Sequence, residues 1–599
     1  MEEKLDNISR KKERIDVKLW QGFFEFLKKY KIKVLLLLLV MVLVGLIEAT
    51  FPYLTRFAID TFVVPKSFNG FWKFIAAFSL LTTIQSINTY VLIVLAGKIE
   101  TGMTRDIRNS AFSKLQKLPL SFFDANGTGP LIARIMSDVQ RVTGILSWGM
   151  VDTVWGISTM TFITFYLFRL NWKMALFVVG SIPVIFFVSL YFQKLILRHY
   201  RIVRRYNSEV TGKFNEGILG AKTTKILSVE EKTIAEFSQL TSKMRQEAIK
   251  ASVISSIYTP IIVQIGSIVT ALILVYGSKN LEQGSITYGT LAAFISYSIQ
   301  FFEPLRELSR VMADVISSQA AGERVMEVLR AQSEGESSRE YALAEFGFEG
   351  NVEFRNVSFK YNTSDMVLKN FNLKVKKGER IAIVGPTGSG KSTIVNLLGR
   401  FYEPTEGKIY FDGVNYTEID LRTLRKNIGY VLQVPHLFNG TIAENIAVGK
   451  PGCTLEEIVE AAKVVNVHDY IVKLKDGYNT LVGEGGTNLS VGQRQLIALA
   501  RVVLANPKII VMDEATSSID AHTEHIIQES IDKILHGRTS FVIAHRLSTI
   551  RSADRILVIE NGEIIEDGSH EQLMKKRGHY YRLYMQQFVE EKEKELFNV

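Results

Sequence analysis

Cysteine is nearly absent from the 599-residue sequence, which contains Cys453 and no second one. A single cysteine excludes a disulfide framework within one chain, and we interpret Cys453 as a plain structural residue. The sequence also lacks a His/Cys cluster of the kind that holds a structural metal. Low-complexity segments are missing too. Residues 1–30 are highly charged and have no small-residue cleavage site, so we expect no cleavable secretory signal in this segment.

Long apolar runs, by contrast, are concentrated in residues 1–310. A membrane-spanning helix needs about 20 mostly apolar residues. We predict six spans, at Val34–Phe57, Trp72–Ala96, Ile145–Phe168, Met174–Leu195, Ala251–Tyr276 and Tyr288–Pro304. The sixth is the weakest, because it is short and polar at both ends. A large soluble helical core is the alternative, but Leu35–Leu46 is almost purely aliphatic, whereas a soluble helix keeps a polar stripe.

Lysine and arginine mark the orientation of these spans. They are frequent in the N-terminal segment and in the connections after the second and fourth spans, and sparse in the other connections. Because such an excess marks the cytoplasmic side, we expect a multi-pass protein of the cytoplasmic membrane with both termini in the cytoplasm. We interpret the net charge of +10 as a signature of a membrane protein. No basic patch with interleaved aromatic residues suggests a nucleic-acid partner.

Residues 17–31 mix aromatic side chains with lysines, which predicts an amphipathic helix on the membrane surface; a solvated linker is the alternative. The two long cytoplasmic connections repeat apolar residues at helical spacing, so we expect helices that extend well beyond the bilayer. Each connection has a break midway, the first at Pro119–Pro130 and the second at Glu216–Gly220. These tips are where an extended arm could touch a cytoplasmic domain.

The most informative motif lies in the second half, where strands alternate with helices as in an α/β domain. The apolar strand Arg380–Val384 leads into a glycine-rich loop, and a helix follows at Ile394–Leu398. This order is the context of a phosphate-binding loop. The loop consists of Gly385, Pro386, Thr387, Gly388, Ser389, Gly390, Lys391, Ser392 and Thr393. Lys391 can reach the β- and γ-phosphates of a nucleoside triphosphate and Ser392 can hold Mg²⁺; a chance glycine-rich turn is the alternative.

Two further predicted strands end in residues suited to the same chemistry. Lys508–Met512 is followed by Asp513, which can orient Mg²⁺, and by Glu514, which can polarise the attacking water as a general base. For either carboxylate a helix N-cap is the plainer alternative. Thr539–Ala544 delivers His545, which could contact the γ-phosphate.

Several short motifs, taken with the loop, resemble the nucleotide-binding domain of ATP-binding cassette proteins. Ser490-Val491-Gly492-Gln493 corresponds to the signature of that family. The resemblance assigns further roles: Tyr361 stacks on adenine, Gln433 senses Mg²⁺ and the transport domain, Asp520 lies in a loop that crosses a dimer interface, and His545 is the switch histidine.

The first half resembles the six-helix transport domain of exporters of the same family, with coupling regions at Phe122–Asp138 and Glu216–Gly220. The fold class is therefore expected to be a membrane α-helical domain, of the six-helix exporter type, joined to an α/β P-loop NTPase cassette. The expected boundaries are a cytoplasmic N-terminus with the amphipathic helix at 1–32, a transmembrane domain at 33–325, a linker at 326–349 and the cassette at 350–599.

The resemblance implies a half-transporter that hydrolyses ATP with Mg²⁺, works with a second half-transporter in the lipid bilayer, and exports a small molecule. An amphipathic drug-like or lipid-like substrate is a family-level expectation. Polar residues in the spans, Glu48, Asp152 and Gln264, could face a cavity; Glu48 and Asp152 could equally pair with neighbours. A nucleotide-gated channel or a regulatory half-subunit is the alternative, and a soluble cassette enzyme acting on DNA would require that the spans not insert.

Val491 departs from the family pattern, which has glycine at this position. A β-branched side chain would crowd a backbone that must approach a γ-phosphate closely. Within the family, heterodimeric exporters often pair a chain with an intact glutamate and an altered signature with a chain of the reverse kind. Glu514 together with Val491 fits the first type, so we favour a heterodimer over a homodimer.

Overall fold

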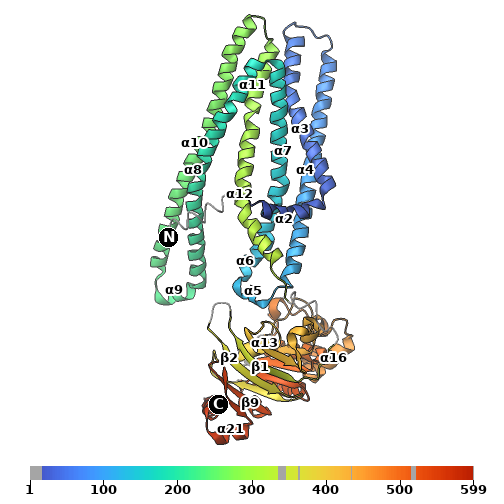
Figure 1. Cartoon of the computed structure of the whole chain (residues 1–599), viewed down its shortest axis with the longest axis vertical. Helices are drawn as coiled ribbons and strands as arrows, with labels where there is room; N and C mark the ends of the chain where they lie inside the picture. The colour runs from blue at the N-terminus through green and yellow to red at the C-terminus, as the bar shows by residue number, and fades with distance from the viewer. Residues whose placement is uncertain are drawn as a thin grey trace. The chain divides into compact units, whose positions relative to one another are not determined.

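The computed structural model describes residues 16–334, 346–361, 365–433, 435–513, 521–544 and 546–597. The chain forms two compact units (Figure 1). The helical unit comprises Met1–Gln116 and Gly127–Ala331, and the α/β unit comprises Lys117–Asn126 and Gln332–Val599. A short segment from the first half of the sequence therefore belongs to the α/β unit.

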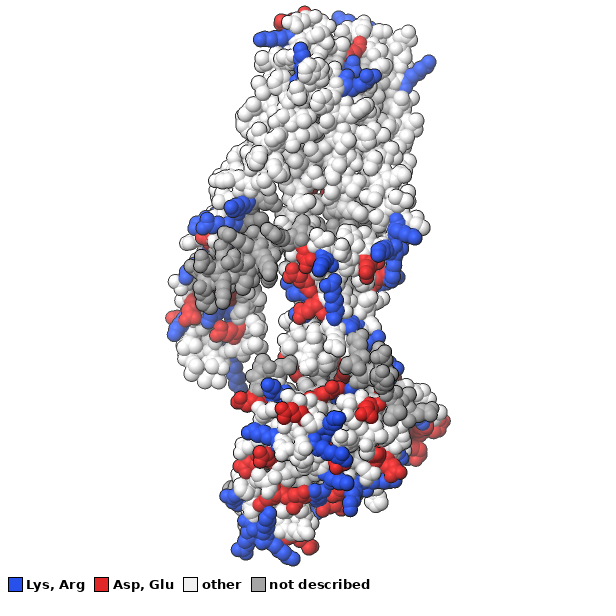
Figure 2. Space-filling view, viewed as in Figure 1, with Lys and Arg blue, Asp and Glu red and all other residues white. Residues whose placement is uncertain are grey.

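Five helical stretches of the described chain are long and apolar enough to cross a membrane. The elements in them are α3 (Lys31–Ala58) with the π-helix η1 (Ile59–Val63), α4 (Phe71–Leu115), α6 (Thr128–Ala133) with the π-helix η2 (Arg134–Asp138) and α7 (Val139–Leu170), α8 (Trp172–Leu219), and α10 (Glu230–Glu282). They contain the first five predicted spans. The face of the helical unit seen in Figure 2 carries a broad band without charged side chains, as a lipid-facing surface requires.

The sixth predicted span is divided between two helices, α11 (Tyr288–Gln300) and α12 (Phe302–Arg330). Pro304 has no N–H to donate to the carbonyl of Gln300, so the helical hydrogen-bond ladder is interrupted near Phe301. With 13 residues, α11 alone is shorter than the about 20 residues that span a bilayer. The predicted sixth span, Tyr288–Pro304, therefore lies on α11 and the first turn of α12, which Phe301 joins in a helical backbone conformation.

The amphipathic helix predicted near the N-terminus is α2 (Val17–Lys28). The Asp16 carboxylate caps it by accepting from the backbone N–H groups of Lys18 and Leu19, at 2.9 and 3.2 Å. Its apolar face, which includes Trp20 and Phe23, is buried in a cluster with α3, α4, α7 and α12. The apolar side chains that suggested a membrane surface are thus largely covered by the helical unit itself.

Acidic side chains within the spans are paired with neighbours. The carboxylate of Glu48 accepts from Trp155 Nε1 at 2.7 Å and from Gln85 Nε2 at 3.4 Å. Asp152 accepts from Arg310 at 2.7 Å. For both residues the structure supports the pairing alternative.

The second cytoplasmic connection is an arm made by α8, the short α9 (Ala221–Leu227) and α10. In Figure 1, α9 lies at the tip where α8 and α10 turn back on each other. The turn begins at Gly220, the last residue of the predicted break. With 48 residues and a rise of about 1.5 Å per residue, α8 is roughly 70 Å long, more than twice the hydrocarbon thickness of a bilayer.

The α/β unit contains a six-stranded sheet in the order β10-β9-β3-β8-β7-β6. Its strands are β3 (Arg380–Val384), β6 (Ile428–Val431), β7 (Ile509–Asp513), β8 (Thr539–Ile543), β9 (Arg555–Glu560) and β10 (Glu563–Gly568). All neighbours pair in parallel except β9 and β10. Because the carboxyl ends of parallel strands share one edge of a sheet, the residues after β3, β6, β7 and β8 gather there.

A second, antiparallel sheet has the order β2-β1-β4-β5. Its strands are β1 (Val352–Phe359), β2 (Leu368–Val375), β4 (Glu406–Phe411) and β5 (Val414–Asn415). The described helices of this unit are α5 (Leu120–Ala125), α13 (Lys391–Leu398), α14 (Leu421–Lys426), α15 (Ile442–Ala447), α16 (Leu455–Val464), α17 (His468–Lys473), α18 (Val491–Ala505), α19 (Ala521–Leu535), α20 (Leu547–Arg551), α21 (His570–Lys576) and α22 (His579–Phe597), with 3₁₀ turns η4 (Tyr416–Glu418), η5 (Gly477–Asn479) and η6 (Glu484–Gly486).

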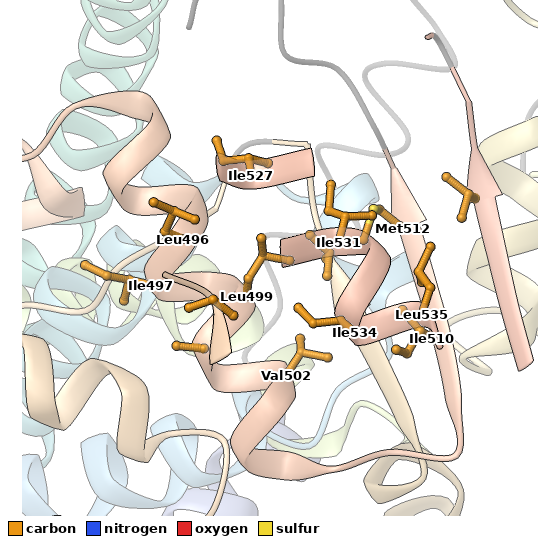
Figure 3. Packing of buried hydrophobic residues seen from close by; sticks show 14 of the residues in the cluster. Leu496, Ile497, Leu499, Val502, Ile510, Met512, Ile527, Ile531, Ile534 and Leu535 are labelled. Atoms are coloured by element: carbon orange, nitrogen blue, oxygen red, sulfur yellow. The ribbon is translucent and has the colours of Figure 1, made fainter. Parts of the chain in front are cut away.

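The core beside the six-stranded sheet positions the signature helix. Buried side chains of α18, among them Leu496 and Leu499, pack with Ile527 and Ile531 of α19 and with Met512 of β7 (Figure 3). Burying a Leu or Ile side chain stabilises a fold by about 1.5–3 kcal/mol. This packing fixes the start of α18 relative to the strand that ends at Asp513.

Candidate functional site

The phosphate-binding loop joins β3 to α13, as the sequence predicts. The backbone at Gly390 has φ +104°, a left-handed conformation that favours glycine. At Gly385 a Cβ atom would lie 2.1 Å from the carbonyl oxygen of Ile559 in β9. Both glycines are therefore required by local geometry. They allow the backbone to fold closely over the start of α13, where free N–H groups and the helix dipole favour an anion.

Two side chains of the loop are arranged for a phosphate. Lys391 is buried, and its ammonium donates to the carbonyl oxygens of Gly385 and Pro386, both at 2.8 Å. Burial lowers the pKa of Lys391, while the nearby charge of Asp513 opposes that shift. The hydroxyl of Ser389 is buried without a hydrogen-bond partner among the described residues. An incoming phosphate oxygen would satisfy this hydroxyl, so the residues present fit a nucleoside triphosphate.

Residues proposed for Mg²⁺ lie on the same edge of the sheet. Ser392 is exposed in the first turn of α13, Asp513 ends β7, and Gln433 is exposed shortly after β6. Mg²⁺ typically uses one or two carboxylates together with substrate phosphates and water. The chemistry of this set fits Mg²⁺ held jointly with a triphosphate. Among the described residues, no group of three or more His, Cys, Asp or Glu side chains could hold a metal without such a ligand.

Three predicted site residues, Glu514, Asp520 and His545, lie outside the described residues. The described chain reaches Asp513 at the end of β7 and Ala544 just after β8. The roles of these three residues remain sequence-based predictions.

Tyr361, predicted to stack on adenine, lies beside the phosphate-binding loop. Its hydroxyl is 3.2 Å from the hydroxyl of Thr393. Its ring lies nearly perpendicular to those of Phe359 and Tyr402, with centroids 4.8 and 5.2 Å away. An aromatic ring held by such perpendicular neighbours offers a rigid face for stacking.

The signature residues form the start of α18. Ser490 caps the helix: its hydroxyl accepts from the Gln493 backbone at 3.2 Å, and the Gln493 side chain accepts from the Ser490 backbone at 2.9 Å. This capping box stabilises the helix end by about 1 kcal/mol. Gly492 is buried, whereas Val491 is 41% exposed. The valine side chain is therefore accommodated within its own α/β unit, and crowding would arise only against a nucleotide approaching from outside.

Replacing Val491 by Gly is expected to increase ATP hydrolysis by about tenfold, which corresponds to relief of roughly 1.4 kcal/mol of crowding. Steady-state hydrolysis in lipid would measure it. Val17→Gly is a matched control, because Val17 is also an exposed valine directly after a capping residue, in α2. Equal rates for Val491→Gly and the unmodified chain would show that this signature does not limit turnover.

The sequence analysis missed Tyr402 and its partner in α5. The Tyr402 hydroxyl donates a short hydrogen bond to the carboxylate of Asp124. Asp124 was noted at the tip of a helical arm, but Tyr402 belongs to no motif. No sequence signal could have connected the two positions.

Comparison with known proteins gives consistent matches over both halves. Residues 34–305 match the family described as ABC transporter transmembrane region, and residues 368–517 match the family described as ABC transporter. An ATP-dependent lipid A-core flippase of Syntrophus aciditrophicus is 35% identical over 553 residues, covering 92% of each chain. A putative multidrug export ATP-binding/permease protein of Bacillus subtilis is 33% identical over 573 residues, covering 94% of this chain and 98% of the relative.

A fatty acid ABC transporter ATP-binding/permease protein of Mycobacterium bovis is 37% identical over 481 residues, covering 80% of this chain and 75% of the relative. Among solved structures, a bacterial Atm1-family ABC exporter with ATP bound aligns with a TM-score of 0.79 at 28% identity. That alignment covers 93% of this chain and 98% of the exporter. The likeness therefore extends over the transmembrane and the nucleotide-binding parts together.

Proposed function

The chain belongs to the ABC transporter family, as an exporter half-transporter with one transmembrane region and one ATP-binding cassette, and from this premise we propose that its substrate is an amphipathic lipid-like or drug-like compound. Proteins of this kind couple ATP hydrolysis to export and function as dimers. The relatives reported above are named as a lipid A-core flippase, a fatty acid transporter and a putative multidrug exporter.

A groove in the helical unit carries the substrate proposal. It has a volume of about 480 Å³ and lies between α10, α11 and the start of α12. Its lining is mostly apolar and includes Leu274 and Phe302. It also contains an ion pair, in which the Arg306 guanidinium lies 2.5 Å from Glu303 Oε1. A site of this size suits a drug-sized ligand. Apolar walls with a charged pair match a molecule that has a hydrophobic body and a polar or charged end.

We assign the following roles to residues of the cassette, from the geometry of the phosphate-binding loop and from the family resemblance. The loop and Lys391 would hold the phosphates, and Ser392, Asp513 and Gln433 would hold Mg²⁺, which stabilises charge on the transferred phosphoryl group. Glu514 would act as the base on the attacking water, with His545 close to the γ-phosphate. In a cassette dimer, Ser490, Gly492, Gln493 and Asp520 would complete the site of the opposite chain.

A different half-transporter is the proposed partner, and Val491 supports this choice. The cassette and both termini are assigned to the cytoplasm from the distribution of Lys and Arg. Negligible ATP hydrolysis by the folded chain alone in lipid is the expected result for a heterodimer subunit. Strong hydrolysis by the chain alone would identify a competent homodimer and make Val491 a tolerated variation.

Transport itself tests the substrate proposal. The chain, with its partner if hydrolysis requires one, would be reconstituted in vesicles with outward-facing cassettes. ATP is then expected to drive uptake of the cationic amphiphile Hoechst 33342 or movement of a fluorescent phospholipid, and Phe302→Ala is expected to weaken it. ATP hydrolysis that neither compound stimulates, without ATP-dependent movement of either, would contradict an amphipathic substrate.

A further inference from the structure

The segment Lys117–Asn126 is held in the α/β unit at two places. At one end, the backbone carbonyl of Lys117 accepts from the Glu334 N–H at 2.7 Å. Glu334 in turn binds the Arg425 guanidinium through both carboxylate oxygens, at 2.9 and 2.5 Å. Arg425 also donates to the carbonyls of Gly399 and Arg400, at 3.2 and 3.0 Å. This end is therefore tied to the residues that follow α13.

At the other end, Asp124 of α5 accepts the hydrogen bond of Tyr402. Burial and the Asp124 carboxylate both raise the pKa of the Tyr402 hydroxyl, so the phenol stays protonated and remains a donor across the physiological range. A hydrogen bond to a charged acceptor is stronger than one between neutral groups. Tyr402 thus holds α5 through a side-chain hydrogen bond.

The same Tyr402 ring lies edge-on against Tyr361, with centroids 5.2 Å apart and planes at 84°. Both rings also contact Phe359, with planes at 85° for Tyr361 and 61° for Tyr402. The hydroxyl of Tyr361 lies 3.2 Å from Thr393 in the first turn of α13. A chain of direct contacts thus runs from the phosphate-binding helix through two tyrosines to α5.

Open space borders this chain of contacts. A cavity of about 1240 Å³ is lined by α5 residues, by Tyr361 and Tyr402, and by the residues after α13. A planar base stacked on Tyr361 would occupy part of that space and restrict the ring. Because Tyr361 and Tyr402 are in contact, restriction of one ring limits the motion of the other.

We propose that Tyr402 is a positioning residue through which the base of the bound nucleotide, stacked on Tyr361, fixes α5 by way of the Tyr402–Asp124 hydrogen bond. The proposal rests on the proposed function, in which Tyr361 contacts the base. Phosphates act on α13 through the loop, whereas the base acts on α5 through the tyrosine pair. The nucleotide therefore has two distinct effects, and only the second depends on the base.

Hydrogen exchange of the full-length chain in lipid nanodiscs separates these effects. The non-hydrolysable ATP analogue AMP-PNP is expected to slow amide exchange both in residues 385–393 and in residues 117–126. Inorganic tripolyphosphate, which has no base, is expected to slow exchange in 385–393 only. For residues 117–126, AMP-PNP is expected to slow amide exchange by about tenfold. This factor corresponds to the free energy of about one hydrogen bond to a charged group.

Tyr402→Phe retains the ring and removes the hydroxyl, so it is expected to abolish the slowing in 117–126 while leaving that in 385–393 intact. Asp124→Ala, which removes the acceptor, should have a similar effect, and the double variant should add nothing further because both changes remove the same interaction. Tyr410→Phe makes the same chemical change in β4 of the same unit, where the ring packs on Arg355, and should behave as the unmodified chain.

Several outcomes would overturn the proposal. These are equal protection of 117–126 by tripolyphosphate and by AMP-PNP, protection of 117–126 that survives Tyr402→Phe, or additive effects in the double variant. Failure of AMP-PNP to protect 385–393 in the unmodified chain would instead reject the nucleotide site itself. The two failures are therefore distinguished in one experiment.

Discussion

Replacing Glu514 by Gln is expected to lower the rate of ATP hydrolysis by about 100-fold or more, the contribution typical of a general base. Glu514 directly follows Asp513, where the buried strand β7 ends on the same sheet edge as the phosphate-binding loop. The amide preserves size and hydrogen-bonding capacity but cannot accept the proton of the attacking water. Nucleotide should still bind, so the variant should retain ATP while turning it over very slowly.

Hydrolysis by the competent assembly in lipid, measured beside retention of radiolabelled ATP, tests this result. Glu563→Gln is a suitable control, because Glu563 is exposed in β10 of the same sheet. Undiminished hydrolysis in Glu514→Gln would remove this residue from the catalytic role. Loss of both hydrolysis and ATP retention would show that Glu514 supports binding or folding and not the chemical step.

Lys391→Ala is expected to weaken ATP binding by about 100-fold. The substitution removes the hydrogen bonds from the ammonium to the phosphates, and the loss of hydrogen bonds to a charged group typically costs about 2–3 kcal/mol. The ammonium is buried in the loop and held by two backbone carbonyls. A triphosphate offers the ammonium stronger acceptors than those carbonyls. Alanine would leave buried phosphate charge without its cation, which is costly in a site of low dielectric.

Equilibrium binding of a fluorescent ATP analogue measures the effect of Lys391→Ala. The exposed Lys408 of β4 provides the control, as Lys408→Ala. Because Lys391 also bonds to its own loop, the melting temperature without nucleotide should be compared in both variants. An unchanged dissociation constant in a Lys391→Ala chain that melts normally would contradict the assignment of the phosphate-binding loop.

The parts of the fold that could be predicted are those encoded in one contiguous stretch of sequence. The strand at Arg380–Val384 was predicted with the bounds of β3, since an apolar run that meets a glycine-rich loop has few other solutions. The long spans were found because hydropathy alone identifies them. The division between α11 and α12 was missed because it depends on one absent N–H group at Pro304, which changes neither hydropathy nor length.

The candidate site divides in the same way. The phosphate-binding loop is local in sequence, so its geometry follows from its own glycines and from the strand and helix beside it. The Tyr402–Asp124 hydrogen bond joins residues 278 positions apart, and neither flanking sequence shows a sign of the other. Burial of the α2 face was likewise invisible, because an aromatic stripe looks the same whether lipid or protein covers it.

The α/β unit is built from two separate parts of the sequence, so the order of synthesis affects when it can fold. Residues 117–126 leave the ribosome long before Tyr402, which follows Asp124 by 278 positions. At about 5–20 residues per second, the delay is on the order of tens of seconds. During that interval the aromatic pair Phe122–Phe123 has no folded partner in the α/β unit, and α8 and α10 are inserted into the membrane. This segment can therefore take its place in the α/β unit only after the residues around Tyr402 have been made.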